Sequence, residues 1–189
     1  MKKRVMALTT LLTLATCAGC ATSRAPKEWY NKSIEYFRDG INLGWNKVDP
    51  EKYGVKEVAS SVAYVTNADG SIKEGTVSVG SSNALGDSYG YLVKDLDGDG
   101  TMELLIGLIN DSPQTQFTDL VVWHSDFGPT HIMSAGDDYM YLNTDGTLLK
   151  PSFTSNDYEL MKYSPEDDAF PLIGTGSLIT AGKFELTPF

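Results

Sequence analysis

The chain has 189 residues, enough for a single domain with its own core. It carries 25 acidic and 15 basic side chains, for a formal net charge of −10. This balance argues against nucleic acid as a partner, because phosphate backbones are bound through lysine and arginine. With only two cysteines, the fold cannot rest on a disulfide framework.

The N-terminal residues have the pattern of an export signal. Met1-Lys2-Lys3-Arg4 precedes an apolar run from Val5 to Ala18, which is the order of charged and apolar regions in a secretory signal peptide. The run of about 14 residues is too short for a helix that spans a bilayer, which needs about 20. We predict a signal peptide over residues 1–19.

The end of this segment, Cys17-Ala18-Gly19-Cys20, resembles the lipobox of bacterial lipoproteins, in which the cysteine is lipidated and becomes the mature N-terminus. The small residues before Cys20 favour that cysteine, while Cys17 and ordinary secretion remain alternatives. The resemblance implies a cell-membrane lipid anchor on the extracytoplasmic face, with residues 20–26 as lipidated cysteine and tether. Cleavage removes three basic residues and no acidic one, which changes the formal charge from −10 to −13. Attachment to an anionic membrane would therefore depend on the acyl chains.

Residues 27–45 are predicted to form an amphipathic helix. Apolar side chains recur every three or four positions, which is the spacing of one helical face. This face is expected to pack on the core, and it consists of Tyr30, Ile34, Phe37, Ile41 and Trp45.

Beyond Pro50 the apolar runs are short and separated by turn residues, which predicts strands. The predicted strands are residues 59–66, 72–79, 88–94, 103–110, 118–124, 138–143, 157–163 and 169–174. The segments 67–71 and 143–147 are rich in Asn and Asp and contain glycine, which predicts hairpin turns; the segment 164–168 is interpreted likewise. Residues 104–109 are apolar on both faces, so we expect a central strand there.

The segment from residue 95 to residue 103 reads Asp-Leu-Asp-Gly-Asp-Gly-Thr-Met-Glu. Carboxylates occupy its first, third and fifth positions, a glycine the sixth and an acidic residue the ninth, as in the opening of a twelve-residue EF-hand calcium loop. The second glycine lets the chain turn so that the carbonyl at the seventh position faces the ion. The predicted calcium ligands are Asp95, Asp97, Asp99, the carbonyl of Thr101 and Glu103, the last directly or through water.

Calcium takes six to eight oxygen ligands, and an EF-hand loop supplies two of them from a glutamate at position twelve. That position is Ile106 here, so further ligands must come from water or from elsewhere, with Asp111, Asp119 and Asp126 as candidates. The alternative interpretation is a solvated acidic turn, although crowded carboxylates repel one another without a cation.

The flanks of the acidic segment are strand-like instead of helical. A strand-loop-strand site of this kind resembles the calcium loops of FG-GAP and VCBS repeats. The run Tyr-x-x-x-Asp-x-Asp-Gly-Asp-Gly-x-x-Glu-Leu, which begins at Tyr91, resembles that of uncharacterised bacterial surface lipoproteins. The resemblance covers about 20 residues and a single copy of the motif, whereas FG-GAP proteins repeat it around a β-propeller.

These elements indicate the α+β class. We expect an N-terminal amphipathic helix followed by a mainly antiparallel β-meander with one strand-loop-strand calcium loop. The helix, the meander and the loop would form a single calcium-binding domain over residues 27–189.

Signals for catalysis are weaker. His124 and His131 lie close in sequence, with Ser125 and Asp126 beside the first. A catalytic triad forms across a fold, so proximity along the chain is poor evidence for one. We interpret this stretch as a strand end and a turn, and we assign no catalytic residue. A zinc site at the two histidines is weaker still, because no further ligands stand at a characteristic spacing.

Two tyrosine pairs, at positions 89 and 91 and at positions 139 and 141, are compatible either with a sugar-binding platform or with cross-strand packing. Abundant carboxylates are also compatible with glycoside hydrolysis. The sequence predicts an exported, lipid-anchored calcium-binding domain that acts as a surface binding or interaction module, with calcium in a structural role. Its expected partners are calcium, the membrane and a cell-surface glycan or protein. The alternative is an extracytoplasmic hydrolase or carbohydrate-binding protein acting on glycans.

Overall fold

A computed structural model of the protein describes residues 25–26, 28–57, 62–66, 72–76, 88–124, 126–135, 138–152, 155–164 and 170–189. The predicted signal peptide, the lipidation site at Cys20, the turn at 67–71 and most of the turn at 164–168 lie outside these residues. Among the described residues, no helix has the length and apolar character needed to cross a membrane.

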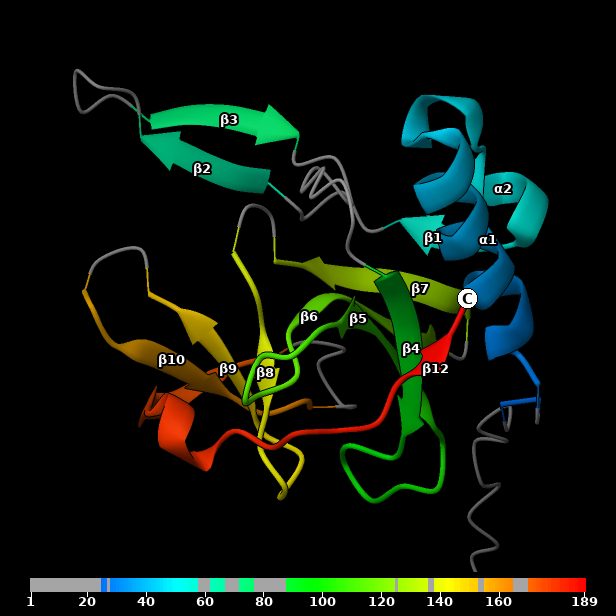
Figure 1. The fold of residues 1–189 in the computed structure, drawn as a ribbon. Helices are drawn as coiled ribbons and strands as arrows, with labels where there is room; N and C mark the ends of the chain where they lie inside the picture. Colours follow the sequence, from blue (N-terminus) through cyan, green and yellow to red (C-terminus); the bar gives the residue numbers. More distant parts are fainter. Residues whose placement is uncertain are drawn as a thin grey trace, which may run out of the picture.

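The chain forms mostly antiparallel sheets (Figure 1). The first sheet has six strands in the order β1-β7-β6-β5-β4-β12, and only the pairing of β1 with β7 is parallel. Its strands are β1 (Lys56–Glu57), β4 (Ser88–Lys94), β5 (Glu103–Ile109), β6 (Phe117–His124), β7 (Gly128–Ser134) and β12 (Thr187–Pro188).

The second sheet has four strands in the order β11-β10-β9-β8. They are β8 (Tyr141–Leu142), β9 (Leu148–Pro151), β10 (Tyr158–Met161) and β11 (Leu172–Gly176). A separate antiparallel pair consists of β2 (Val62–Thr66) and β3 (Ile72–Thr76). The helical elements are α1 (Tyr30–Leu43), η1 (Trp45–Lys47), α2 (Pro50–Tyr53) and η2 (Leu178–Thr180).

The predicted α+β class is wrong. Among the described residues, α1 is the only helix of seven or more residues, and strands dominate the rest. The chain does not form one continuous meander either, because it leaves the first sheet after β7, builds the second sheet and returns with β12. The physical reason is that a single short helix covers part of one face of the first sheet, and the second sheet covers the other face.

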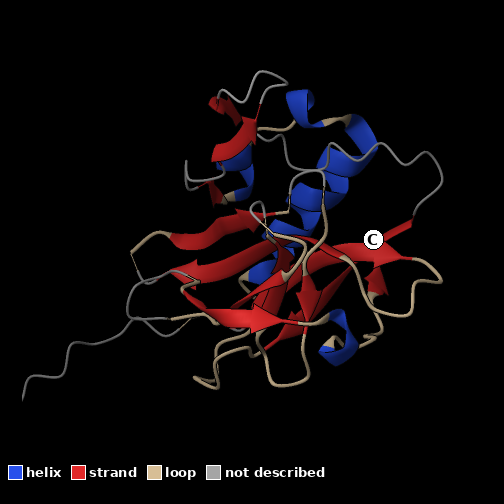
Figure 2. Ribbon diagram, turned by 90° about the vertical axis from the view of Figure 1, so that its left-hand side faces the viewer, coloured by secondary structure: helices blue, strands red, loops and turns tan. Residues whose placement is uncertain are grey.

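The core is divided into two layers by the first sheet. One layer lies under α1 and includes Phe37, Leu104 and Ile106. The other layer lies between the two sheets and includes Leu105 and Leu142. Figure 2 shows α1 and α2 on one side of the strands and η2 on the other. Strand β5 contributes to both layers, which confirms the prediction of a central strand that is apolar on both faces.

Helix α1 is shorter than predicted, and its buried face is rotated from the predicted one. Tyr36 and Phe37 are buried, but so are the small residues Ser33 and Gly40. The ring of Trp45 packs so closely on Gly40 that a Cβ there would lie 2.3 Å from it. The close approach of Trp45 thus requires a glycine at position 40, which the spacing of apolar residues does not indicate.

The C-terminal segment joins the two sheets. Ala181 bridges to Asn143 beside the second sheet, and Thr187 pairs with Tyr91 of β4. Between them, the Thr115 hydroxyl donates to the carbonyl of Phe184 at 3.0 Å and accepts from its N–H at 2.6 Å. These contacts link residues about 70 positions apart, so no local pattern predicts them.

Candidate metal centre

The loop between β4 and β5, residues 95–102, folds around its own carboxylates. Gly98 and Gly100 have φ angles of 84° and 87°, a left-handed conformation that glycine adopts without strain. Backbone N–H groups donate to each aspartate in turn: Gly98 and Gly100 to Asp95, Asp99 to Asp97, and Thr101 to Asp99, at 2.5–3.1 Å. These bonds turn the three carboxylates toward the inside of the loop.

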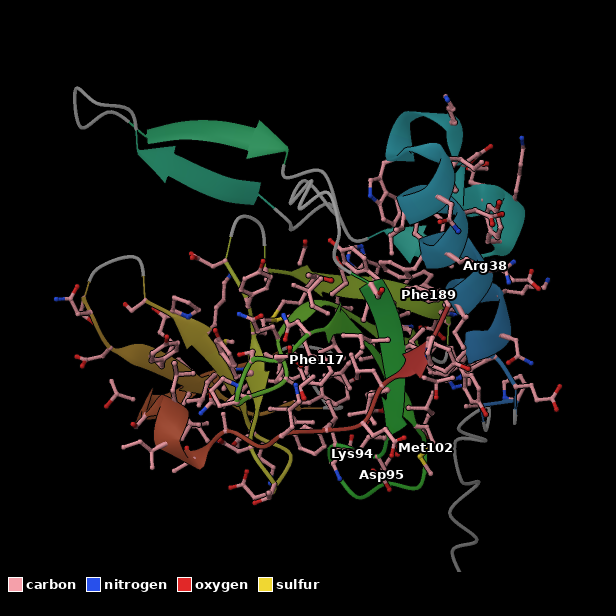
Figure 3. All side chains as sticks on the ribbon, viewed as in Figure 1. Arg38, Lys94, Asp95, Met102, Phe117 and Phe189 are labelled. Atoms are coloured by element: carbon pink, nitrogen blue, oxygen red, sulfur yellow. The ribbon has the colours of Figure 1, made fainter. Side chains whose placement is uncertain are left out.

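The loop brings together three of the predicted ligands. Carboxylate oxygens of Asp95, Asp97 and Asp99 lie within 4.8 Å of one another. Figure 3 shows Asp95 with Lys94 and Met102 at one end of β4. The Oδ2 atom of Asp97 is buried and has no hydrogen-bond partner. Burial raises the pKa of Asp97, and the charges of Asp99 and Asp95 add to this rise. A buried anionic oxygen beside two further anions is unfavourable unless a cation compensates the charge.

Glu103 stands next to this cluster but contacts the backbone. Its side chain is 2% exposed, and its Oε2 accepts a hydrogen bond from the N–H of Leu96 at 2.7 Å. The pKa of Glu103 is raised to about 8, mainly by burial and also by the charges of Asp97, Asp99 and Asp95, against the opposing effect of the Leu96 N–H. Glu103 lies outside the group of three converging carboxylates, so its role as a ligand stays a prediction. The role of the Thr101 carbonyl also stays a prediction.

Leu96 is a member of the site that the spacing of ligands did not reveal. It lies between Asp95 and Asp97, is 4% exposed and belongs to the core layer between the sheets. Its carbonyl lies against Gly146, where a Cβ would be 2.4 Å from the oxygen. The sequence signal was present, because an apolar residue in an otherwise acidic and glycine-rich loop indicates burial.

The three further carboxylates proposed as ligands do not join the group. Asp119 is buried on β6, with Oδ1 3.1 Å from Nε2 of His131. The N–H of Asp126 donates to Nδ1 of His124 at 3.1 Å in the turn after β6. Asp111 is exposed in the loop that follows β5, at the opposite end of that strand from Glu103.

His131 and Asp119 form a buried pair, 4% and 1% exposed. Nε2 of His131 also lies 3.1 Å from the carbonyl of Met133. The ring of Phe37 on α1 packs edge-on over the imidazole, with centroids 5.5 Å apart. This pair therefore belongs to the packing of α1 on the first sheet.

Three of the four tyrosines considered as a sugar platform take part in packing. Tyr89 and Tyr91 pack beside the core layer under α1, and the ring of Tyr91 lies 5.9 Å from that of Phe189. Tyr141 meets Tyr158 of the second sheet edge to face at 5.9 Å.

The chain matches no protein-family model, no curated protein and no solved structure. The resemblance to FG-GAP and VCBS calcium loops and to bacterial surface lipoproteins thus depends on the motif alone and stays a prediction.

Proposed function

We propose that this protein is an exported, lipid-anchored calcium-binding domain that acts as a surface binding or interaction module, with calcium in a structural role. The observation that carries the proposal is the convergence of the carboxylates of Asp95, Asp97 and Asp99, one of whose oxygens, Oδ2 of Asp97, is buried without a hydrogen-bond partner. The export signal and the lipid anchor at Cys20 are supported by the sequence.

The donor chemistry favours calcium over softer metals. Every side chain in the group offers carboxylate oxygen, and calcium takes oxygen ligands in flexible geometry, whereas zinc and copper sites use histidine and cysteine. Backbone N–H groups orient the carboxylates, and each carboxylate oxygen has a second lone pair for an ion. Glu103 and water would complete the coordination shell.

A structural role follows from the expected affinity. Extracellular calcium modules bind at about 10⁻⁴ to 10⁻³ M, so an exported site of this kind remains occupied at the calcium concentrations outside cells. The ion would then stabilise a loop that otherwise holds several carboxylates close together.

Thermal unfolding of the full chain in calcium and in chelator tests the proposal. A ligand at 100 times its Kd adds about 2.7 kcal/mol to the free energy of unfolding, which corresponds to a Tm increase of about 5–10 °C for a chain of this size. Asp97→Asn should abolish the increase, and Asp145→Asn, outside the loop, should retain it. An equal Tm of the wild type in calcium and in chelator would contradict the proposal.

A further inference from the structure

The acidic loop contacts the second sheet through Leu96. The side chain of Leu96 packs in the core layer between the two sheets, together with Leu142 of β8 and Leu148 of β9. All three are at most 4% exposed. A change in the position of Leu96 must therefore alter the packing of the second sheet, because protein interiors are close-packed.

The backbone of Leu96 is held from two directions. Its N–H donates to the buried carboxylate of Glu103, and its carbonyl lies against Gly146 in the turn between β8 and β9. Gly146 has a φ angle of 87°, and an added Cβ would lie 2.4 Å from the carbonyl oxygen. The loop and the turn thus touch through their backbones with no room for a side chain.

Leu96 is also flanked in sequence by two of the three converging aspartates, Asp95 and Asp97. An ion bound by both carboxylates fixes the backbone on each side of Leu96. We infer that calcium binding at the acidic loop is coupled to the ordering of the β8–β9 turn and the second sheet, through the contact of Leu96 with Gly146. This inference rests on the proposed calcium site and adds a structural consequence of its occupancy.

Coupling between two sites is reciprocal, and its typical size is a factor of about 5 to 150 in affinity. If calcium orders the turn, a substitution that forces the turn away from the carbonyl of Leu96 must weaken calcium binding, whereas one that keeps this contact should not. Gly146→Ala adds a Cβ against Leu96 and leaves all carboxylates in place, so we expect its calcium affinity to fall about tenfold. The matched control is Gly54→Ala, because Gly54 has a φ angle of 67° and no atom within 4 Å of the added Cβ. Its calcium affinity should equal that of the wild type.

Hydrogen exchange of the full wild-type chain, in millimolar calcium and in chelator, measures the coupling without any substitution. We expect calcium to slow amide exchange in residues 95–103 and also in residues 141–149, by about tenfold in each. A parallel calorimetric titration with calcium establishes whether the ion binds.

Two results would overturn the inference in distinguishable ways. Calcium binding with protection confined to residues 95–103 would disprove the coupling and leave the proposed calcium site intact. No calcium binding in the titration would remove the proposed site and the coupling with it. Should Gly146→Ala fail to fold, the wild-type exchange data decide the question alone.

Discussion

The turn at 143–147 and the acidic loop at 95–103 are similar in sequence but differ in what stabilises their carboxylates. In the turn at 143–147, the Asp145 carboxylate accepts from the Thr147 hydroxyl at 2.7 Å and the Thr147 N–H at 3.0 Å. These bonds lower the pKa of Asp145. In the loop at 95–103, burial raises the pKa of Asp97 and that of Glu103, the latter to about 8. A hydroxyl and an N–H satisfy the single carboxylate of the first turn, whereas the three converging carboxylates of the acidic loop favour a cation.

The turn at 143–147 and the acidic loop also have different structural roles. In the turn at 143–147, Thr147 satisfies the single carboxylate, and Gly146 supplies a close backbone contact; the oxygen without a partner there is the neutral Asn143 Oδ1. The acidic loop supplies the carboxylates and inserts Leu96 into the core beside that turn. The two segments differ in the number of carboxylates that converge. The acidic loop has three, whose oxygens lie within 4.8 Å of one another.

The largest expected effect comes from the apolar anchor of the acidic loop. Leu96→Ala leaves a cavity between the sheets and should lower the free energy of unfolding by about 2–5 kcal/mol. Met102→Ala is the matched control in the same loop, because Met102 is 42% exposed, and its effect should stay within about 0.5 kcal/mol. Urea unfolding of both variants measures the difference. Equal stabilities would show that the loop is not anchored through Leu96.

A smaller effect is expected when the turn at 143–147 loses its internal partner. The hydroxyl of Thr147 accepts from Asn143 Nδ2 and donates to Asp145. Thr147→Val leaves the buried Asn143 amide without this acceptor and should cost about 1–3 kcal/mol. The control is Thr180→Val at an exposed hydroxyl. A loss of similar size in the control would show that removal of any threonine hydroxyl has this effect, and that the partners of Thr147 do not cause it.

The two turns should respond to pH in opposite directions in chelator. Glu103 has a folded pKa of about 8 against an ordinary 4.5, so the folded state holds the proton longer. The contribution of Glu103 to the free energy of unfolding is therefore fully present below pH 4.5. It decreases as the pH rises toward 8, by at most about 1.4 kcal/mol per pH unit. The lowered pKa of Asp145 contributes stability above its ordinary value of 3.8, and this contribution is lost in acid.

Urea unfolding between pH 5 and pH 8 checks the first of these directions. Glu103→Gln retains an oxygen for the Leu96 N–H and removes the titrating group, so its stability should vary less over this range. A wild type that becomes more stable from pH 5 to pH 8 in chelator would contradict the assignment of the raised pKa to Glu103.

The smallest effect is expected for Asp145→Asn. The amide retains an oxygen that can accept from Thr147, and Asp145 is exposed, so the change in stability should stay within about 0.5 kcal/mol. Chemical denaturation at pH 7 is sufficient to measure it. A decrease of more than about 2 kcal/mol in the free energy of unfolding, on the order of a buried group left without its partner, would show that the Asp145 carboxylate makes a stabilising contact beyond its own turn.

Features set by short sequence separation were predictable, and those set by distant contacts were not. The cluster of Asp95, Asp97 and Asp99 follows from alternate positions and two glycines. The central strand at 104–109, buried as far as Leu108, follows from its composition. Strands β1, β7, β9 and β12 were missed. β1 and β12 have two residues each and pair with the distant strands β7 and β4. β7 and β9 pair with their chain neighbours, but β7 begins with Gly128-Pro129, which indicates a turn, and β9 has only four residues and ends in Pro151. The α+β class was wrong because a strong helical pattern in one segment says nothing about what covers the rest of the sheet.

The contact of Leu96 with Gly146 was missed for the same reason, since a glycine in a hairpin turn is explained locally by its positive φ angle. Only the folded chain shows that the same glycine is also required by a close approach from the acidic loop.

Calcium binding by the acidic loop is tested most directly by an NMR titration of the full chain with calcium chloride, with the backbone amides of the loop and of the turn at 143–147 as reporters. We expect saturable shifts at Gly98 and Gly100, with a Kd of about 10⁻⁴ to 10⁻³ M. These shifts should disappear in Asp97→Asn and persist in Asp145→Asn. Shifts that survive in Asp97→Asn, or a loop that does not respond to calcium at all, would contradict calcium binding by these carboxylates.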